Sequence, residues 1–284
     1  MQEFTDRVAV ITGAAAGIGR GLAERCIKEG MKVVIADIDE ETIRKCEAEW
    51  NDDGASVLAI PTDVSKLSDV EHLAKETLGA FGAVHLLCNN AGVIVPGVIW
   101  ENTLADWEWV LGVNLWGVIH GIHVFVPLML LQDSEAHIVN TASPAGLVAG
   151  PGWGIYRVTK HGVISLSETL YYDLAQLGAK LKVSVLCPDT VNTKFVDSGR
   201  IRPAELQNES NNQIRRPEVE LQEQTLRQAL SNGTSPDQVA DHVFNGIRAE
   251  KFYILMQFDR GERPQWSERV RIRTENILQE VNPS

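Results

Sequence analysis

Three side chains in this sequence have the chemistry to act on a carbonyl group or an alcohol: Ser143, Tyr156 and Lys160. Tyr156 and Lys160 lie four residues apart, so on a helix the phenol and the ammonium group share one face. A cation beside a tyrosine favours its ionised form, which predicts a lowered phenol pKa and a side chain that both donates and accepts a proton. Ordinary amphipathic helices also carry this spacing, so the interpretation depends on the surrounding elements.

A glycine-rich turn near the N-terminus supplies that context. The apolar run of residues 7–11 leads into Thr12-Gly13-Ala14-Ala15-Ala16-Gly17-Ile18-Gly19, and a helical pattern follows. This order predicts a strand, a turn and a helix, in which Gly13 allows the turn, Gly17 lets the backbone approach a pyrophosphate and Gly19 permits close packing. A second apolar run, residues 32–36, ends at Asp37, whose carboxylate would accept hydrogen bonds from an adenosine ribose. The alternative for Asp37 is a surface aspartate that caps the next helix.

Together with Asn89-Asn90-Ala91-Gly92 and Asn114, these motifs resemble the short-chain dehydrogenase/reductase family across about residues 5–258. The resemblance implies that Tyr156 protonates a carbonyl oxygen as hydride arrives from nicotinamide, or deprotonates the alcohol in the reverse direction. It also implies that Lys160 binds the nicotinamide ribose and that Asn114 orders a water linking Lys160 to solvent. Ser143 follows an apolar strand and is placed to donate a hydrogen bond to the same substrate oxygen, with a helix or turn cap as the alternative.

The motifs and the resemblance assign further residues to the cofactor and to the substrate. The predicted cofactor contacts are Gly13, Ala16, Gly17, Ile18, Gly19, Asp37, Ile38, Asp63, Val64, Asn90, Ala91, Gly92, Tyr156, Lys160, Pro188, Val191 and Thr193. The predicted substrate-pocket residues are Val95, Pro144, Leu147, Trp153, Asp189 and Phe195. Asp63 has an alternative role as the N-cap of the following helix. The Pro188-Asp189 pair departs from the family's usual Pro-Gly, and the turn is expected to survive because aspartate tolerates a left-handed backbone.

The same positions predict the choice of cofactor. A negative group at Asp37 disfavours the 2'-phosphate of NADP. NADP-preferring relatives typically place Arg or Lys just before the second glycine or just after the aspartate position, and these residues are Ala16 and Ile38 here. NAD is therefore the expected cofactor.

Apolar runs near 7–12, 32–37, 55–60, 84–88, 136–142, 181–187 and 252–256 alternate with helical patterns. This alternation predicts an α/β fold, a Rossmann-like doubly wound parallel sheet of about seven strands flanked by helices, in a single domain. We expect an NAD-binding and catalytic domain over residues 1–258 and a C-terminal helical extension over 259–284. Residues 189–217, rich in Asn, Arg and Pro, are expected to form the irregular loop that covers the substrate.

Bulk properties favour a cytoplasmic enzyme. The net charge of -12 argues against nucleic acid and anionic membranes as partners, and the four cysteines lack metal-like pairing, which fits reduced thiols. His120 and His123 lack further ligands, so no metal site is expected. The longest apolar stretch, residues 118–131, is interrupted by polar residues and Pro127, so no membrane span is expected. The aromatic residues Trp107, Trp109 and Trp116 fit packing or a subunit interface, and the resemblance implies a homodimer or homotetramer.

The predicted activity is NAD-dependent interconversion of a hydrophobic secondary alcohol, such as an aryl or cyclic one, and its ketone. The predicted pocket residues are mostly apolar and include no Arg or Lys that would clamp a carboxylate. One alternative is an epimerase or dehydratase of the same fold, whose glycine spacing and longer C-terminal domain differ from this chain. Another alternative is a non-catalytic, NAD-sensing regulatory protein, which usually lacks the tyrosine or the lysine.

Overall fold

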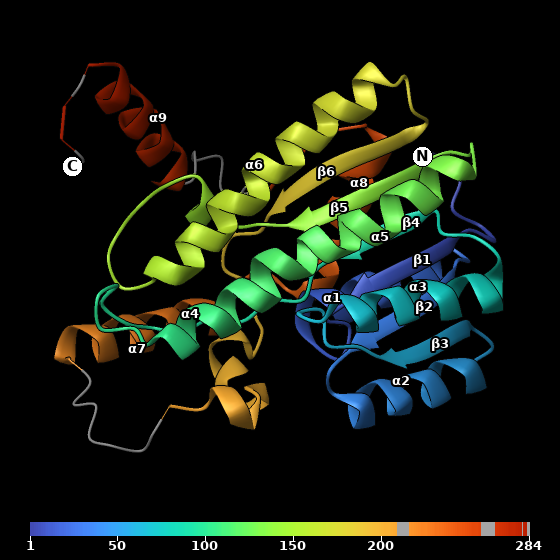
Figure 1. Ribbon diagram of the computed structural model, residues 1–284, viewed down its shortest axis with the longest axis horizontal. Helices are drawn as coiled ribbons and strands as arrows, with labels where there is room; N and C mark the ends of the chain where they lie inside the picture. The colour runs from blue at the N-terminus through green and yellow to red at the C-terminus, as the bar shows by residue number, and fades with distance from the viewer. Residues whose placement is uncertain (209–215, 257–264, 280, 283–284) are drawn as a thin grey trace.

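The computed structural model describes residues 1–208, 216–256, 265–279 and 281–282. Seven parallel strands form one sheet in the order β3-β2-β1-β4-β5-β6-β7 (Figure 1). Their bounds are β1 Val8–Thr12, β2 Lys32–Asp37, β3 Ser56–Pro61, β4 Leu86–Asn89, β5 Ala136–Thr141, β6 Leu181–Cys187 and β7 Tyr253–Leu255. The predicted doubly wound parallel sheet is confirmed, and each predicted strand lies within two residues of an observed one.

Helices cover both faces of the sheet. The described α-helices are α1 Gly17–Lys28, α2 Glu40–Asp52, α3 Leu67–Phe81, α4 Leu104–Leu111, α5 Gly117–Leu131, α6 Gly154–Gln176, α7 Pro217–Ser231, α8 Pro236–Arg248 and α9 Gln265–Leu278. Successive residues of one strand serve opposite faces, as the pleat requires. Ala9 and Ile11 pack in the core beneath α1, α2 and α8, whereas Val10 packs in the core beneath α3, α5 and α6. Because both faces are covered, the strands are apolar almost throughout.

The strand order reverses between β1 and β4. Val10 pairs with Val34 of β2 on one side and with Leu87 of β4 on the other. The chain therefore leaves β1 and β4 towards opposite faces, and a crevice opens at their carboxyl ends, where ligands bind in open α/β sheets. The glycine turn follows β1 and the Asn90 turn follows β4, so both predicted cofactor motifs lie at this crevice.

A continuous helical stretch runs from Leu104 to Leu131, with a π-helical turn at Gly112–Trp116 between α4 and α5. By length and composition alone it could cross a membrane, and one third of its most apolar window is buried. Thr103 and Asp106 form a capping box at its start. The stretch packs against α3 and α6, so these two helices bury part of its apolar surface.

The structure describes most of the predicted substrate loop. It contains short 3-10 helices at Phe195–Ile201 and Ala204–Leu206, and α7 begins at Pro217. Residues 209–215 of the predicted loop and residues 257–264 of the predicted domain boundary lie outside the described residues.

Candidate active site

The start of α1 is open to an anion. Its N-cap is Ala16, which makes no side-chain capping hydrogen bond, and its first turn contains no acidic residue. The first N–H groups of the helix and its dipole are therefore free to bind a phosphate. Gly13 has φ +67°, and a Cβ at Gly19 would lie 2.1 Å from the Gly13 carbonyl oxygen. These two glycines have the turn and packing roles predicted for them, and the cradle they leave fits a dinucleotide pyrophosphate.

Asp37, at the end of β2, fixes the glycine turn from the side. The N–H of Ala15 donates to Asp37 Oδ2 at 3.0 Å, and the N–H of Asp39 donates to Oδ1 at 3.1 Å. The capping role considered for Asp37 belongs to Asp39, which accepts from the N–H of Thr42 at 3.1 Å at the start of α2. Asp37 thus lines the cavity beside Ile38, in the position expected for a ribose-binding carboxylate.

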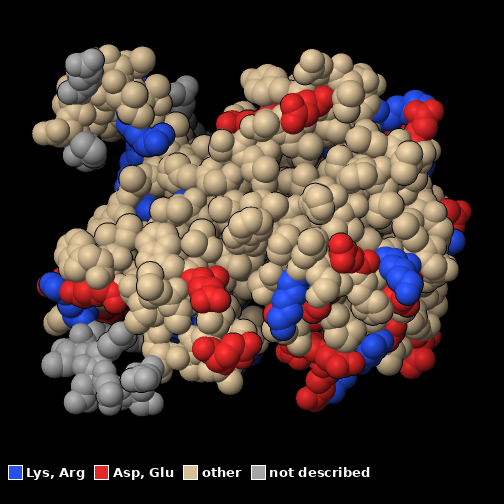
Figure 2. Space-filling view, viewed as in Figure 1, with Lys and Arg blue, Asp and Glu red and all other residues tan. Residues whose placement is uncertain are grey.

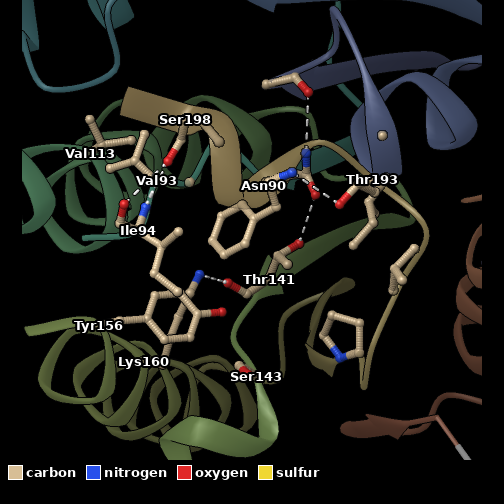
Figure 3. Close-up of a pocket in the computed structure, with 18 of the residues that line it drawn as sticks. Asn90, Val93, Ile94, Val113, Thr141, Ser143, Tyr156, Lys160, Thr193 and Ser198 are labelled. Carbon is tan, nitrogen blue, oxygen red and sulfur yellow. Dashed lines mark hydrogen bonds between the residues drawn. The ribbon is translucent and has the colours of Figure 1, made fainter. Parts of the chain in front are cut away.

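Thr12 and Asn90 join the ends of β1 and β4. The N–H of Asn90 donates to Thr12 Oγ1 at 2.9 Å, and Asn90 Nδ2 donates to the Thr12 carbonyl at 3.0 Å. Thr141 Oγ1, at the end of β5, donates to Asn90 Oδ1 at 3.3 Å (Figure 3). The floor of the crevice is therefore cross-linked by side chains from three adjacent strands.

Ser143 and Tyr156 meet where β5 ends and α6 begins. Ser143 Oγ accepts from the N–H of Ala145 at 3.1 Å and caps the short 3-10 helix Pro144–Gly146. The same serine hydrogen bonds to the phenol of Tyr156. The cap and the catalytic position are therefore compatible, and Figure 3 shows both side chains in one hollow.

Lys160 lies beneath the Tyr156 ring and is only 3% exposed. Its Nζ lies 5.6 Å from the ring centroid and donates to the Thr141 carbonyl at 2.7 Å. Burial lowers the pKa of Lys160 to about 8. The bond to the Thr141 carbonyl is its one hydrogen bond to the described residues, so further ammonium N–H groups remain for a ligand.

The lowered pKa that was expected for the Tyr156 phenol is not found. Burial raises the pKa of Tyr156 to about 12, and the hydrogen bond with Ser143 opposes this rise only in part. The phenol stays protonated at neutral pH, which suits a proton donor to a ketone. Alcohol oxidation needs the phenolate, which additional positive charge near the ring would favour.

Asn114 lies in the π-helical turn and is fully buried. Its Oδ1 accepts from the N–H of Val93 at 2.8 Å, and its Nδ2 donates to the Val93 carbonyl at 2.9 Å and to Thr159 Oγ1 at 3.3 Å. Asn114 therefore positions the strand-to-helix connection beside Lys160. The water that the family resemblance assigns to it stays a prediction.

One cavity of about 640 Å³ contains both halves of the site. Its lining includes every predicted cofactor contact except Gly19, which packs behind the turn. Pro144, Trp153, Asp189 and Phe195 line its substrate end, and the rings of Phe195 and Tyr156 lie 5.7 Å apart.

Two predicted pocket residues lie elsewhere and are corrected here. Val95 packs with Trp109 and Ile155, and Leu147 packs with Val163 and its neighbours, because both side chains turn into the core. Neither lines the cavity.

A sequence model of the family described as "short chain dehydrogenase" matches residues 7–202. The chain belongs to the short-chain dehydrogenase family. A short-chain dehydrogenase/reductase from Burkholderia phymatum, solved in complex with NAD, is similar in structure with a TM-score of 0.94 and 44% identity, covering 100% of this chain and 98% of that one. A CLA biosynthesis dehydrogenase/reductase of Lactiplantibacillus plantarum is 33% identical over 283 residues, which are 100% of this chain and 97% of the relative. A C alpha-dehydrogenase of Sphingobium sp. (strain SYK-6) is 33% identical over 258 residues, 90% of this chain and 82% of the relative.

Asp189 does not need the left-handed backbone conformation that was considered for it. Among the described residues other than glycine, positive φ occurs only at Asp6, Asp133 and Glu250. Asp189 Oδ1 accepts from the N–H of Thr190 at 2.9 Å. Burial raises the pKa of its carboxyl, and the Thr190 hydrogen bond opposes this rise. The residue therefore contributes a polar wall to the substrate end without backbone strain.

Asp63, a predicted cofactor contact, lines the cavity. Asp63 binds Ser65 and Lys66, while α3 begins after Lys66, so the capping role considered for Asp63 is wrong.

Several residues that line the cavity were not predicted. Trp109 was assigned to packing or an interface, yet it also lines the cavity. The unpredicted lining residues at the substrate end include Glu108, Val148, Arg157, Lys194, Arg200, Ile201, Leu206, Leu226, Leu230, Trp266 and Arg269. No motif marks them, because they come from helices and loops far apart in the sequence.

A buried ion pair anchors the substrate loop to α4. Arg202 Nη1 lies 2.6 Å from Asp106 Oδ1, and the two side chains are 8% and 4% exposed. Asn208 Nδ2 donates to the same oxygen at 3.0 Å, and the Arg202 guanidinium lies 5.2 Å from the Trp109 ring centroid. Ser198 adds a second anchor, because its Oγ accepts from the N–H of Ile94 at 3.0 Å. The described part of the loop is therefore fixed at two points beside the cavity.

Proposed function

We propose that this protein is an NAD-dependent dehydrogenase or ketone reductase that interconverts a hydrophobic secondary alcohol and its ketone. The observation that carries the proposal is the convergence of Ser143, Tyr156 and Lys160 in the cavity that also contains the glycine turn. The bound cofactor would supply or accept the hydride. Family membership supports the reaction class, and the apolar lining residues support the substrate class.

Each side chain has a separate task in this proposal. Tyr156 donates its phenolic proton to the carbonyl oxygen in reduction and removes the hydroxyl proton in oxidation. Ser143 donates a hydrogen bond to the same oxygen and stabilises the charge that develops there. Lys160 keeps its ammonium group below the Tyr156 ring, available to ribose hydroxyls and to a developing phenolate.

The preference for NAD follows from the charges at the adenosine end. Asp37 and Asp39 both line the cavity there, together with the neutral Ala16 and Ile38. The 2'-phosphate of NADP would lie beside these carboxylates, and neither Ala16 nor Ile38 supplies a cation to neutralise it. The repulsion would weaken the binding of NADP. The ribose diol of NAD can instead donate to Asp37.

We also propose a homo-oligomer that buries the apolar surface of α5 and α6. Leu131 of α5 and Val158 and Tyr172 of α6 are exposed, as is Trp116 in the π-helical turn that precedes α5. Figure 2 shows few charged side chains over α5, whereas charges crowd over α2. Exposed apolar surface of this kind is typical of protein interfaces.

The test is a panel of aryl, cyclic and aliphatic secondary alcohols, each assayed with NAD and with NADP by absorbance of the reduced cofactor. Turnover of apolar members with NAD and much weaker turnover with NADP are expected. Equal kcat/KM for the two cofactors would contradict the assignment of Asp37. A complete lack of turnover, with NAD still bound, would instead support the regulatory alternative.

A further inference from the structure

Two arginines from distant parts of the chain meet over the loop that precedes α6. Arg157 lies in the first turn of α6, and its Nη1 donates to the Val148 carbonyl at 2.8 Å. Arg269 lies on α9, and its Nη2 donates to the Ala149 carbonyl at 2.7 Å. A Cβ at Gly150 would lie 3.0 Å from Arg157 Nη2 and 3.2 Å from Arg269 Nη2, so both guanidinium groups border one point. Figure 1 shows how α9 stands off the body beside this loop.

The two guanidinium groups have no counter-charge in the described part of the chain. No described residue places a carboxylate in ion-pair contact with either arginine, whereas Arg202 and Arg227 each have such a partner. Burial lowers the pKa of Arg157, and the neighbouring charge of Arg269 lowers it further. The two positive charges repel each other, so an anion bound between them would be stabilised.

Unused hydrogen-bond donors point to the same conclusion. Arg157 Nε and Trp266 Nε1 are buried and have no acceptor among the described residues. Trp266 lies one turn before Arg269 on α9, and all three side chains line the cavity. A buried N–H without an acceptor is costly, and native structures usually satisfy such groups with protein, water or a ligand.

We propose that Arg157 and Arg269 bind a carboxylate of the substrate, so that the preferred substrate is an apolar secondary hydroxy acid or keto acid. This inference rests on the proposed function, because the arginines share the cavity with Tyr156 and Ser143. Guanidinium groups match the planar geometry of a carboxylate. A singly charged anion also suits a cavity with many apolar lining residues, since a doubly charged anion would cost more to desolvate.

The walls fit a molecule with two polar ends. Apolar side chains line the substrate end of the cavity alongside the arginines and the catalytic pair: Val148, Trp153, Phe195, Leu226 and Trp266. The carbinol carbon would lie at Tyr156 and the carboxylate at the arginine pair, with an apolar chain or ring between them. The predicted pocket residues included no Arg or Lys, whereas the structure places Arg157 and Arg269 at the cavity.

The test compares saturated secondary hydroxy acids of increasing chain length with their methyl esters, which retain the carbinol and lose the charge. At the best chain length the wild type should prefer the acid by about tenfold or more in kcat/KM, the scale of one charge-assisted hydrogen bond. Arg269→Gln should remove most of this preference, because kcat/KM for the acid should fall much more than kcat/KM for the ester. Arg273→Gln, one turn further along the exposed face of α9, is the matched control and should behave as the wild type.

A binding measurement separates this inference from the proposed function. Saturated carboxylates without a hydroxyl group should quench tryptophan fluorescence in the wild type and in Arg273→Gln, and much more weakly in Arg269→Gln. Selective binding without turnover of any alcohol would overturn the proposed function and support the carboxylate site. Equal use of acid and ester by the wild type, with NAD-linked turnover intact, would overturn the carboxylate site alone. Loss of the oligomer in Arg269→Gln with an unchanged acid-to-ester ratio would assign the arginine pair to a subunit contact and also overturn the inference.

Discussion

The buried ion pair between Arg202 and Asp106 offers a sharp test of how the substrate loop is held. In Arg202→Met the carboxylate of Asp106 would keep its hydrogen bonds from Asn208 and Thr103 and lose its cation. Removal of one partner from a buried pair costs about 3–5 kcal/mol, because the other charge is left uncompensated. Because Asp106 keeps its other hydrogen bonds, we expect a loss at the lower end of this range, about 3 kcal/mol in the free energy of unfolding.

The pH dependence gives this prediction a second readout. Burial alone would raise the pKa of Asp106, but hydrogen bonds from Asn208, Thr103 and Arg202 and the charge of Arg202 lower it below 3.8. In the wild type this carboxylate therefore stabilises the fold above about pH 4, and the contribution is lost as the pH falls through the lowered pKa. In Arg202→Met the stability deficit should be largest at neutral pH and should shrink in acid as Asp106 becomes protonated.

Urea unfolding monitored by tryptophan fluorescence measures both effects. Arg227→Met is the matched control, since Arg227 pairs with Asp197 on the same loop but both side chains are nearly half exposed, and such pairs contribute about 1 kcal/mol or less. Asp106→Asn in the Arg202→Met background should recover part of the loss by removing the unpaired charge. A loss in Arg202→Met no larger than in Arg227→Met, or a deficit independent of pH, would refute the anchoring role.

Three further predictions concern the cofactor, the lysine and the loop. Asp37→Ser combined with Ile38→Arg should narrow the preference for NAD over NADP by a few kcal/mol at most, measured as kcat/KM with each cofactor; an unchanged ratio would show that discrimination lies elsewhere. The pKa of Lys160 falls from 10.5 to about 8 in the folded protein, so the folded state binds the proton less well than the unfolded state. Lys160→Met should therefore gain stability relative to the wild type below pH 8, by up to about 3 kcal/mol, and this gain should fade between pH 8 and 10.5; a pH-independent difference in urea unfolding would contradict it. Residues 189–208 and 216–217 should gain protection from hydrogen exchange when NAD and a substrate analogue bind, and equal protection in both states would make the loop a fixed wall.

The sequence predicts the fold well because its strands are short apolar runs with both faces covered. The glycine turn, Asp37 and the Tyr156 and Lys160 pair were also predicted, since each depends on local spacing that the backbone converts directly into geometry. The arginine pair was not predictable in this way. Arg157 is one of the positions between Tyr156 and Lys160 that the motif leaves unspecified. Arg269 belongs to a C-terminal segment in which Arg and Glu are interleaved, a pattern typical of a solvent-exposed helix. Only the tertiary contact of α9 with the loop before α6 brings them together.

The buried pair of Asp106 and Arg202 was missed for a similar reason. Its two residues are 96 positions apart, and in the sequence each of them is typical of an ordinary charged surface residue. Val95 and Leu147 show the reverse error, because an apolar residue near a catalytic motif can turn into the core as readily as into the cavity. The prediction of a lowered pKa for the Tyr156 phenol was wrong, because residue spacing indicates proximity to Lys160 but not the effect of burial.

The role of Tyr156 as the acid and base is the central claim, and Tyr156→Phe tests it most directly. The substitution removes only the phenolic oxygen and keeps the ring against Phe195. Turnover of the best alcohol from the panel with NAD should fall by about a hundredfold or more in kcat, while NAD binding measured by calorimetry should stay near the wild-type value. Wild-type turnover in Tyr156→Phe would contradict the account.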